Sequence, residues 1–440
     1  MFDVLIVGAG MVGASLACAL GDKNNPGNRS LKVGIIEARS DLLQGQFGAD
    51  GRASAIALGS SYIWQNIGVW DAMYRRGVTP MHCVQVSDGD YPHKVKLLRE
   101  DVGKEALGYI VENRVTQESL WEFMRECSNI EWICPAKIKN ISWVDADGSA
   151  NLGNVGVQLP AQDSAPATHL QQSIQVQINS DIGDRWLSAK LLVAADGGRS
   201  IVRQLAGIPT SERLYNQTCI VVTVKHEYPH CNTAYERFQS SGPFAILPLS
   251  GDRSCIVWTA TSAEAPVLMA LDEVEFMREL SKKFGGHLGK LTLETRYTER
   301  ATYVPRWMHA QTYIQPRLAL IGDAAHTTHP VAGQGMNLGI RDVSAIAEIL
   351  LDAYHKGEDI GSTNVLTSYQ TRRRLDNLGV ITVTDLTNRL FSNQFILFKW
   401  MRRVGLAILT VKPFKQLLMY FMMGLASREP HLSVTLKNNN

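Results

Sequence analysis

The chain has 440 residues, with 44 Lys and Arg against 42 Asp and Glu, 45% hydrophobic residues and 8% aromatic residues. This balance excludes a disordered or collagen-like polymer, and the length allows two or three domains, sequential or interleaved. The net charge of +2 and the lack of a DNA- or RNA-binding motif argue against nucleic acid as a partner.

The chain opens with a pattern typical of a βαβ unit. Residues 3–7 form a short apolar run of strand type, and residues 11–20 carry the small and apolar residues of a buried helix. After a polar stretch rich in turn residues, residues 32–37 read as a second strand that ends in an acid, Glu37.

The rest of the chain alternates between two kinds of pattern. Residues 77–190 contain mainly strand-like runs, and residues 191–195 resume the buried-strand pattern. More strand-like runs fill residues 216–305, which predicts a second domain built on a sheet. Residues 318–322 return to the buried-strand pattern, and the chain is mostly helical from Ala345 onward.

The turn between the first strand and the first helix reads Gly8-Ala-Gly10-Met-Val-Gly13, a dinucleotide-binding fingerprint in its expected place. Gly8 makes the turn, Gly10 lets the backbone approach a pyrophosphate, and Gly13 lets the helix pack on the sheet. The helix N-terminus faces the phosphates, and Glu37, 24 residues after Gly13, is placed to hold the ribose hydroxyls. A tight glycine turn in an unrelated α/β protein is the alternative interpretation.

Three further stretches accompany this fingerprint. They are Asp50-Gly-Arg52, the run 193–200 with Asp196-Gly197, and the run 320–342 with Gly322-Asp323. In this order they resemble the class A flavoprotein monooxygenases, the aromatic-ring hydroxylases related to para-hydroxybenzoate hydroxylase. Within that superfamily, the chain is similar to the ubiquinone-biosynthesis hydroxylases of the 2-polyprenylphenol and 2-polyprenyl-6-methoxyphenol type. The runs that carry this closer resemblance are residues 108–121, 242–249 and 402–406.

The resemblance covers nearly the whole chain and implies an α/β fold (two-domain α+β). A Rossmann-like FAD-binding domain is expected to be interleaved with a β-sheet substrate domain and followed by a helical C-terminal tail. The FAD-binding domain is expected in three parts, 1–76, 108–215 and 306–360. The substrate domain is expected at 216–305 with a further segment at 77–107, and the basic helical C-terminal region at 361–440.

The resemblance also implies a set of cofactor-binding residues. Arg52 reaches the pyrophosphate, and Asp323 hydrogen-bonds the ribityl or ribose hydroxyls. Gln117 contacts the flavin chain, and Asp196 lies where the FAD phosphates and the passing nicotinamide cofactor meet. The glycine-rich backbone of residues 330–337 lies against the isoalloxazine ring. The full set is Gly8, Gly10, Gly13, Glu37, Arg52, Gln117, Asp196, Gly322, Asp323, Pro330, Gly333, Gly335, Met336 and Asn337.

Several of these motif residues have a plainer interpretation. The alternatives are a surface ion pair for Arg52, an exposed helix position for Gln117 and a helix N-terminal acid for Asp342. His326 and His329 are candidate bases, but histidines within a flavin motif are more often structural. No catalytic residue is assigned, because the cofactor carries the hard chemistry.

The activity implied is that of an FAD-dependent, NAD(P)H-consuming monooxygenase that hydroxylates a polyprenylated phenol in ubiquinone biosynthesis. The sequence contains no second glycine fingerprint for an NAD(P)H domain. NAD(P)H is therefore expected to dock transiently, reduce the flavin and leave before O2 forms a flavin C4a-hydroperoxide. Three alternatives stay open: hydroxylation of a small soluble aromatic, flavin-dependent reduction of an isoprenoid double bond, and a scaffold of a quinone-synthesis complex in which FAD is structural.

The C-terminal region, residues 361–440, holds 11 basic and three acidic residues. Residues 391–409 read as a helix, and a second apolar run covers residues 417–425. Basic residues suited to anionic lipid lie among these runs: Lys399, Arg402, Arg403, Lys412 and Lys415. Two interpretations stay open, a helical cap or dimer contact, and attachment to a membrane surface or a quinone-biosynthesis complex.

The seven cysteines are scattered and include no CxxC pair, which argues against a disulfide framework and a metal site. The N-terminus lacks the basic start of a signal peptide, and no 18-residue apolar run occurs. We therefore expect a bacterial-type cytoplasmic protein without metal or targeting peptide, peripheral to the inner membrane. The oligomeric state is not encoded in these patterns.

Overall fold

The first sheet is parallel and is built from strands that lie far apart in the sequence. Five strands pair in the order β8-β2-β1-β12-β22. They are Ile130–Ile133 (β8), Val33–Ile36 (β2), Phe2–Val7 (β1), Gly183–Ala194 (β12) and Leu318–Leu320 (β22). Val4, Leu5 and Ile6 of β1 are fully buried, as expected for a parallel sheet covered on both faces. The computed structural model describes residues 1–23, 30–44, 51–89, 94–145, 150–152, 173–294, 300–393 and 395–425.

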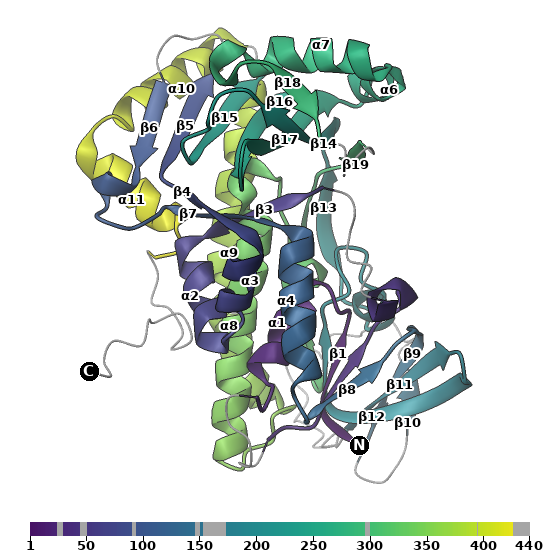
Figure 1. The fold of residues 1–440 in the computed structure, drawn as a ribbon. Coiled ribbons are helices and arrows are strands. Elements are labelled where there is room, and N and C mark those ends of the chain that lie inside the picture. The colour runs from purple at the N-terminus through teal and green to yellow at the C-terminus, as the bar shows by residue number, and fades with distance from the viewer. Residues whose placement is uncertain are drawn as a thin grey trace, which may run out of the picture.

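Helices pack on this sheet, and a hairpin region extends one of its strands. The helix α1 (Met11–Ala19) follows β1 and packs against α4 (Asn113–Arg125) and α8 (Gln334–His355) (Figure 1). The first half of β12 leaves the parallel layer and pairs antiparallel with β11. The hairpin strands are Ala136–Val144 (β9), Ala150–Leu152 (β10) and Ser173–Ser180 (β11).

The second sheet has eight strands and lies at the opposite end of the molecule from the hairpin strands (Figure 1). Its order is β18-β14-β17-β16-β15-β5-β6, and β19 also pairs with β14. The strands are Cys83–Asp88 (β5), Lys94–Leu98 (β6), Gln217–His226 (β14), Thr233–Gln239 (β15), Gly242–Leu249 (β16), Arg253–Thr261 (β17), Leu291–Leu293 (β18) and Ala301–Tyr303 (β19). The helices α6 (Glu264–Ala270) and α7 (Glu273–Phe284) cover one face, where Phe276 and Leu280 join the apolar side chains of the sheet. The other face is left to line a cavity.

Two three-stranded sheets and several short elements connect these layers. One sheet has the order β3-β7-β4, and the other has the order β13-β20-β23. Their strands are Ala53–Ala57 (β3), Val78–Met81 (β4), Gly108–Glu112 (β7), Thr210–Leu214 (β13), Arg306–Ala310 (β20) and His326–Thr327 (β23). The remaining short elements are Leu58–Ile67 (α2), Trp70–Gly77 (α3), Ile201–Leu205 (α5) and Ile314–Gln315 (β21).

Three helices end the described chain: α9 (Thr363–Ser392), α10 (Ile396–Ile408) and α11 (Lys412–Met422). Arg402 of α10 donates to the Asp88 carboxylate at the end of β5 at 2.8 Å, and both side chains are buried. Lys415 of α11 forms an ion pair with Asp101. The expectation that Arg402 and Lys415 face anionic lipid is therefore wrong, because both fasten the tail to the rest of the protein.

The predicted fold class is confirmed: a Rossmann-like α/β layer is combined with a β-sheet layer and followed by C-terminal helices. The domain boundaries stay predictions. No disulfide joins any of the seven cysteines in the described part of the chain, and the described ranges contain no cluster of three or more metal-ligating side chains. Among the described helices, none is by itself long and apolar enough to cross a membrane; Trp400–Ile408 and Lys412–Met422 meet the test only as a pair bent by 95°.

Candidate active site

One large cavity lies between the parallel layer, the second sheet and the C-terminal helices, and several predicted FAD motifs meet at one end of it. Its volume is about 900 Å³, within the range of cofactor and ligand sites. The predicted residues that line it are Gly10, Arg52, Asp323, Pro330, Gly333, Gly335, Met336 and Asn337. The predicted residues outside its lining are Gly8, Gly13, Glu37, Gln117, Asp196 and Gly322.

The glycine fingerprint has the close packing that its spacing predicts. A Cβ at Gly13 would lie 2.0 Å from the Gly8 carbonyl oxygen, and a Cβ at Gly8 would lie 2.6 Å from the Ala195 oxygen. At Gly10 a Cβ would meet nothing within 4 Å, so the turn is open to the cavity. The N-terminus of α1 therefore presents its backbone N–H groups there, which suits a phosphate.

Two predicted carboxylates lie beside the cavity and accept hydrogen bonds from backbone. Glu37 follows β2, and its Oε2 accepts from the Ala9 N–H at 2.8 Å, which fixes it next to the glycine turn. Asp196 Oδ2 accepts from the N–H groups of Ile201 and Val202 at 2.8 and 3.2 Å, at the start of α5. Its Oδ1 is buried with no hydrogen-bond partner among the described residues, and burial raises its pKa. Asp196 thus caps α5, while the glycine after it lines the cavity.

Asp323 faces the cavity in the turn after β22. The residue is exposed to the cavity. Desolvation by the surrounding protein raises the pKa of its carboxyl, against the opposing charges of His326 and Arg306. Within the described part of the chain its carboxylate accepts no hydrogen bond. A carboxylate that points into a cavity in this way fits a hydroxyl donor on a ligand.

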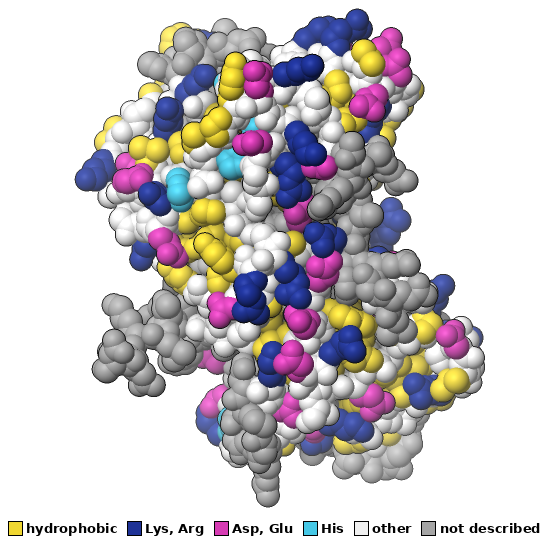
Figure 2. Space-filling view, viewed as in Figure 1, with side chains coloured by type: hydrophobic (Ala, Val, Ile, Leu, Met, Phe, Trp, Pro, Cys, Tyr) yellow, Lys and Arg dark blue, Asp and Glu magenta, His cyan; other side chains and the backbone are white. Residues whose placement is uncertain are grey.

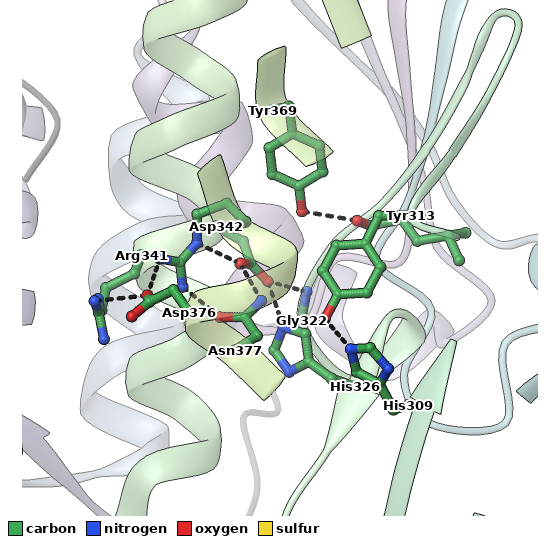
Figure 3. A network of polar contacts seen from close by, with 11 residues as sticks. His309, Tyr313, Gly322, His326, Arg341, Asp342, Tyr369, Asp376 and Asn377 are labelled. Atoms are coloured by element: carbon green, nitrogen blue, oxygen red, sulfur yellow. Dashed lines mark hydrogen bonds and ion pairs between the residues drawn. The ribbon is translucent and has the colours of Figure 1, made fainter. Parts of the chain in front are cut away.

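A buried polar network fixes this turn from behind (Figure 3). Asp342 of α8 accepts from the Gly322 N–H at 3.0 Å and from His326 Nε2 at 2.6 Å. Its second oxygen accepts from Arg373 Nε and Asn377 Nδ2 of α9, both at 2.9 Å. Burial alone would raise the pKa of Asp342, but the charges of His326 and Arg373 hold it well below its usual range. Asp342 is therefore the centre of a structural network and not a helix N-terminal acid.

The other histidines near the turn are also held in buried pairs. His309 Nε2 lies 3.0 Å from the Tyr313 hydroxyl (Figure 3), and His329 Nε2 lies 2.9 Å from the Gln217 side-chain oxygen. Burial lowers the pKa of His309 to about 4 and that of His329 to about 3. His329 does not line the cavity, so its geometry supports the structural interpretation.

The first turn of α8 is fastened to β3 by Asn337. Its Nδ2 donates to the carbonyls of Ala55 and Gly333 at 2.8 Å, and its Oδ1 accepts from the Ala57 N–H at 2.8 Å. Gly333 has φ +60°, and a Cβ there would lie 2.8 Å from the Ala55 Cβ. The side chain of Asn337 therefore holds the glycine-rich loop close to β3, which leaves loop backbone to face a ligand.

Arg52 and Gln117 differ in position. Arg52 is an exposed residue at the cavity, directly before β3. Gln117 is half-buried on α4 and lies outside the cavity lining, whereas Asn113, the first residue of α4, lines it. Contact of Gln117 with FAD stays a prediction, and Asp50 of the same motif lies outside the described residues.

The other end of the cavity is apolar and lies between the second sheet and the C-terminal helices. Phe238 of β15 stacks on Phe391 of α9, with ring centroids 4.0 Å apart. α10, α11 and the residues directly after each helix contribute Leu406, Leu409, Leu418, Met419, Met422 and Met423. The tail is therefore packed on the protein and forms one wall of the cavity.

The cavity lining also contains a carboxylate that was not predicted from the sequence. Glu236 lines the cavity from β15, together with Ala234 and Phe238. Tyr235, between Ala234 and Glu236, also borders the cavity, and its ring lies 4.5 Å from that of His287 between centroids. Burial raises the pKa of Glu236 to about 7. The available signal was the alternation of residues 233–239, which places an acid on the apolar face of a strand.

Comparison with known proteins shows a likeness over nearly the whole chain. Residues 149–381 match the FAD binding domain family. Ubiquinone hydroxylase UbiL of Rhodospirillum rubrum is 37% identical over 96% of this chain and 89% of its own length. The 3-demethoxyubiquinol 3-hydroxylase of Escherichia coli is 32% identical over 92% of this chain and 93% of its own. Among solved structures, p-nitrophenol 4-monooxygenase PnpA of Pseudomonas putida has a TM-score of 0.73 at 18% identity, covering 96% of this chain and 98% of that one.

Proposed function

The chain belongs to the FAD-dependent hydroxylases of ubiquinone biosynthesis, and on that premise we propose how its cavity is used. FAD occupies the glycine-rich end, and the ring of a polyprenylated phenol occupies the end beneath the second sheet. The observation that carries the proposal is that both ends belong to one cavity. FAD held there would supply the redox chemistry, with electrons from NAD(P)H and activation of O2, so that one oxygen atom would enter the ring and the other would leave as water.

The residues of this chain supply binding and positioning. The N-terminus of α1 at Gly10 binds the pyrophosphate, and Glu37 beside it accepts from a ribose hydroxyl. Asp323 accepts from a hydroxyl of the flavin chain, because no protein donor occupies its carboxylate in the described ranges. The network around Asp342 keeps that turn rigid, so that little ordering is required when FAD binds.

The apolar end of the cavity suits the isoprenoid chain of the substrate. Its walls are the inner face of the sheet and the side chains of α10 and α11, among them Leu406 and Met419. Each buried CH2 group contributes about 0.8 kcal/mol. A chain of several isoprene units is therefore held more firmly than a short alkyl group, which supports a polyprenylated substrate over a small soluble aromatic.

The outer side of the same helices supports attachment to a membrane surface. Large apolar side chains are exposed there: Phe395, Leu397, Trp400, Met401, Val404, Ile408, Val411, Phe414 and Leu417. The view in Figure 2 shows apolar side chains among charged ones along the upper left of the molecule, the side where Figure 1 places α10 and α11. Such an apolar patch marks an interaction surface. A lipid bilayer is the occupant we propose, because it also holds the isoprenoid substrate.

Incubation with a prenylated phenol, NAD(P)H and ¹⁸O2 tests the proposal. The expected product carries one ¹⁸O atom on the ring, with one NAD(P)H oxidised per product. Reduction of an isoprenoid double bond without ¹⁸O would indicate the reductase alternative. If a phenol does not stimulate the oxidation of NAD(P)H, FAD has a structural role only. If a small soluble aromatic is turned over faster than the prenylated phenol, the substrate is a small soluble aromatic.

A further inference from the structure

Glu236 is an ionisable group on an otherwise apolar part of the cavity wall. On its own strand the residues two positions away, on the same face, are Ala234 and Phe238, and both line the cavity. Across the neighbouring strands its partners in register are Val86 of β5 and Ala245 of β16. All four line the cavity, so the carboxylate is surrounded on the sheet by side chains that cannot donate a hydrogen bond.

The carboxylate also lacks a partner from the other elements that the structure describes. Burial is the cause of its raised pKa, to about 7. Two titratable groups lie nearby, Cys219 of β14 and Tyr303 of β19. Burial is the main cause that raises the pKa of the Cys219 thiol, and the charge of Glu236 raises it further. Burial raises the pKa of Tyr303 well above its usual range. Tyr303 is therefore protonated near neutral pH and does not compete as a base.

An unpaired carboxylate in an apolar wall costs free energy, because it loses hydration and gains no hydrogen bond. Proteins retain such groups where a ligand supplies the missing partner. In this cavity a bound substrate can supply the donor, because Arg402, a cation of the lining near the sheet, is paired with Asp88.

We propose that the Glu236 carboxylate accepts a hydrogen bond from the phenolic hydroxyl of the substrate and takes its proton as the ring is hydroxylated. This inference rests on the proposed function. It gives the ring a fixed orientation beneath the sheet, and it makes Glu236 a catalytic residue of the hydroxylation.

The phenolic O–H bond breaks, its proton moves to a Glu236 oxygen, and its electron pair enters the ring as the new C–O bond forms. The oxygen comes from O2, with a hydride from NAD(P)H and one proton from solvent. The hydrogen on the hydroxylated carbon then leaves as a proton. Of these three hydrogens, one stays on the new hydroxyl and two leave with the second oxygen atom as water. Glu236 returns its proton to the phenolic oxygen, which restores the aromatic ring and the carboxylate.

Glu236→Gln tests the proposal, because it keeps the shape of the side chain and removes the base. General bases contribute about 10²- to 10⁴-fold to rate, so we expect kcat/KM for hydroxylation to fall at least about 100-fold. In the wild-type holoenzyme kcat/KM should rise with pH through about 7, since the carboxylate has to be ionised, and this acid limb should vanish in the variant. Glu279→Gln on the far side of the sheet, where α7 exposes Glu279 beside Lys282, is the matched control.

A second readout does not require turnover. An alkylated 4-nitrophenol bound to the oxidised holoenzyme reports its own ionisation by its absorbance. A nearby carboxylate disfavours the phenolate and an amide donor favours it. The bound nitrophenol should therefore have a higher apparent pKa in the wild type than in Glu236→Gln, with Glu279→Gln unchanged.

The stability of Glu236→Gln separates a catalytic role from a structural one. Removing an unpaired buried charge should leave the thermal midpoint unchanged or raise it. If Glu236→Gln does not fold, Glu236→Asp tests the catalytic role instead. We expect this variant to be slower than the wild type and to keep the acid limb of the pH profile. A wild-type rate without that limb would contradict a catalytic role for Glu236.

The proposed function and the role of Glu236 fail in different ways. A wild-type enzyme that hydroxylates no phenol contradicts the function itself. A hydroxylating wild type whose Glu236→Gln variant keeps the rate, the pH profile and the nitrophenol titration contradicts only the role of Glu236.

Discussion

Replacing Asp342 by Asn removes the centre of the network behind the Gly322 turn. Asp342 is fully buried and accepts four hydrogen bonds, two on each oxygen. An asparagine side chain retains one oxygen and turns an NH2 group toward two of the donors. Two donors therefore lose their acceptor, and Arg373 loses one of the two carboxylates that face it, with Asp376 remaining.

Breaking a buried ion pair by removing one partner costs about 3–5 kcal/mol. At about 2 °C per kcal/mol in a chain larger than a single small domain, the thermal midpoint should fall by about 6–10 °C. Because the same carboxylate holds the backbone at Gly322, FAD should also dissociate faster from the variant.

Differential scanning fluorimetry and flavin release at pH 7 measure both effects. Asp352→Asn on the same helix is the control, since Asp352 is exposed beside Lys356 and should change stability by less than about 0.5 kcal/mol. Folding lowers the pKa of Asp342, so its ionised carboxylate stabilises the folded state at pH values above the pKa of the unfolded chain, about 3.9. This stabilisation is lost progressively as the pH falls below that value. The gap between wild type and variant should therefore shrink below about pH 4. Equal midpoints and equal flavin release at pH 7 would refute the reasoning.

The remaining predictions concern other parts of the cavity and the tail. Asp323→Ala should weaken FAD retention more than tenfold, because a charge-assisted hydrogen bond contributes about 1.5–3 kcal/mol; unchanged retention in equilibrium dialysis would make Asp323 purely structural. Gly13→Ala should prevent stable folding, since its Cβ would lie 2.0 Å from a carbonyl oxygen. Gly10→Ala should fold and bind FAD less tightly. Equal expression and equal yellow colour of the two variants would contradict this prediction. Trp400→Ser with Leu417→Ser should reduce sedimentation with anionic vesicles while FAD content stays constant, and undiminished sedimentation would exclude the outer face of the tail as the contact.

The parts of the site that follow from short-range spacing could be predicted from the sequence. The glycine turn, Glu37 and the Gly322-Asp323 turn each depend on a strand end and the few residues after it, and backbone rules fix such units locally. The fold class follows for the same reason, because buried-strand runs and their turn signals can be read along the chain.

The parts that depend on tertiary contact could not be predicted. Arg402 pairs with Asp88, 314 positions away, so its charge points inward although the local pattern is that of an amphipathic helix. Asn337 occupies its side chain with the backbone of β3, which only the packed structure reveals. Glu236 was missed because alternating residues of a strand lie on its two opposite faces, and the sequence does not say which of these faces lines the cavity.

Hydroxylation of a polyprenylated phenol is tested by the quinone-pathway intermediate that accumulates in cells lacking this protein, identified by mass spectrometry. We expect a polyprenylated phenol that is one ring oxygen short of the next intermediate, and recovery of quinone when the wild-type chain is restored. Normal quinone content without any accumulated phenol, in cells with no second hydroxylase of this family, would contradict it.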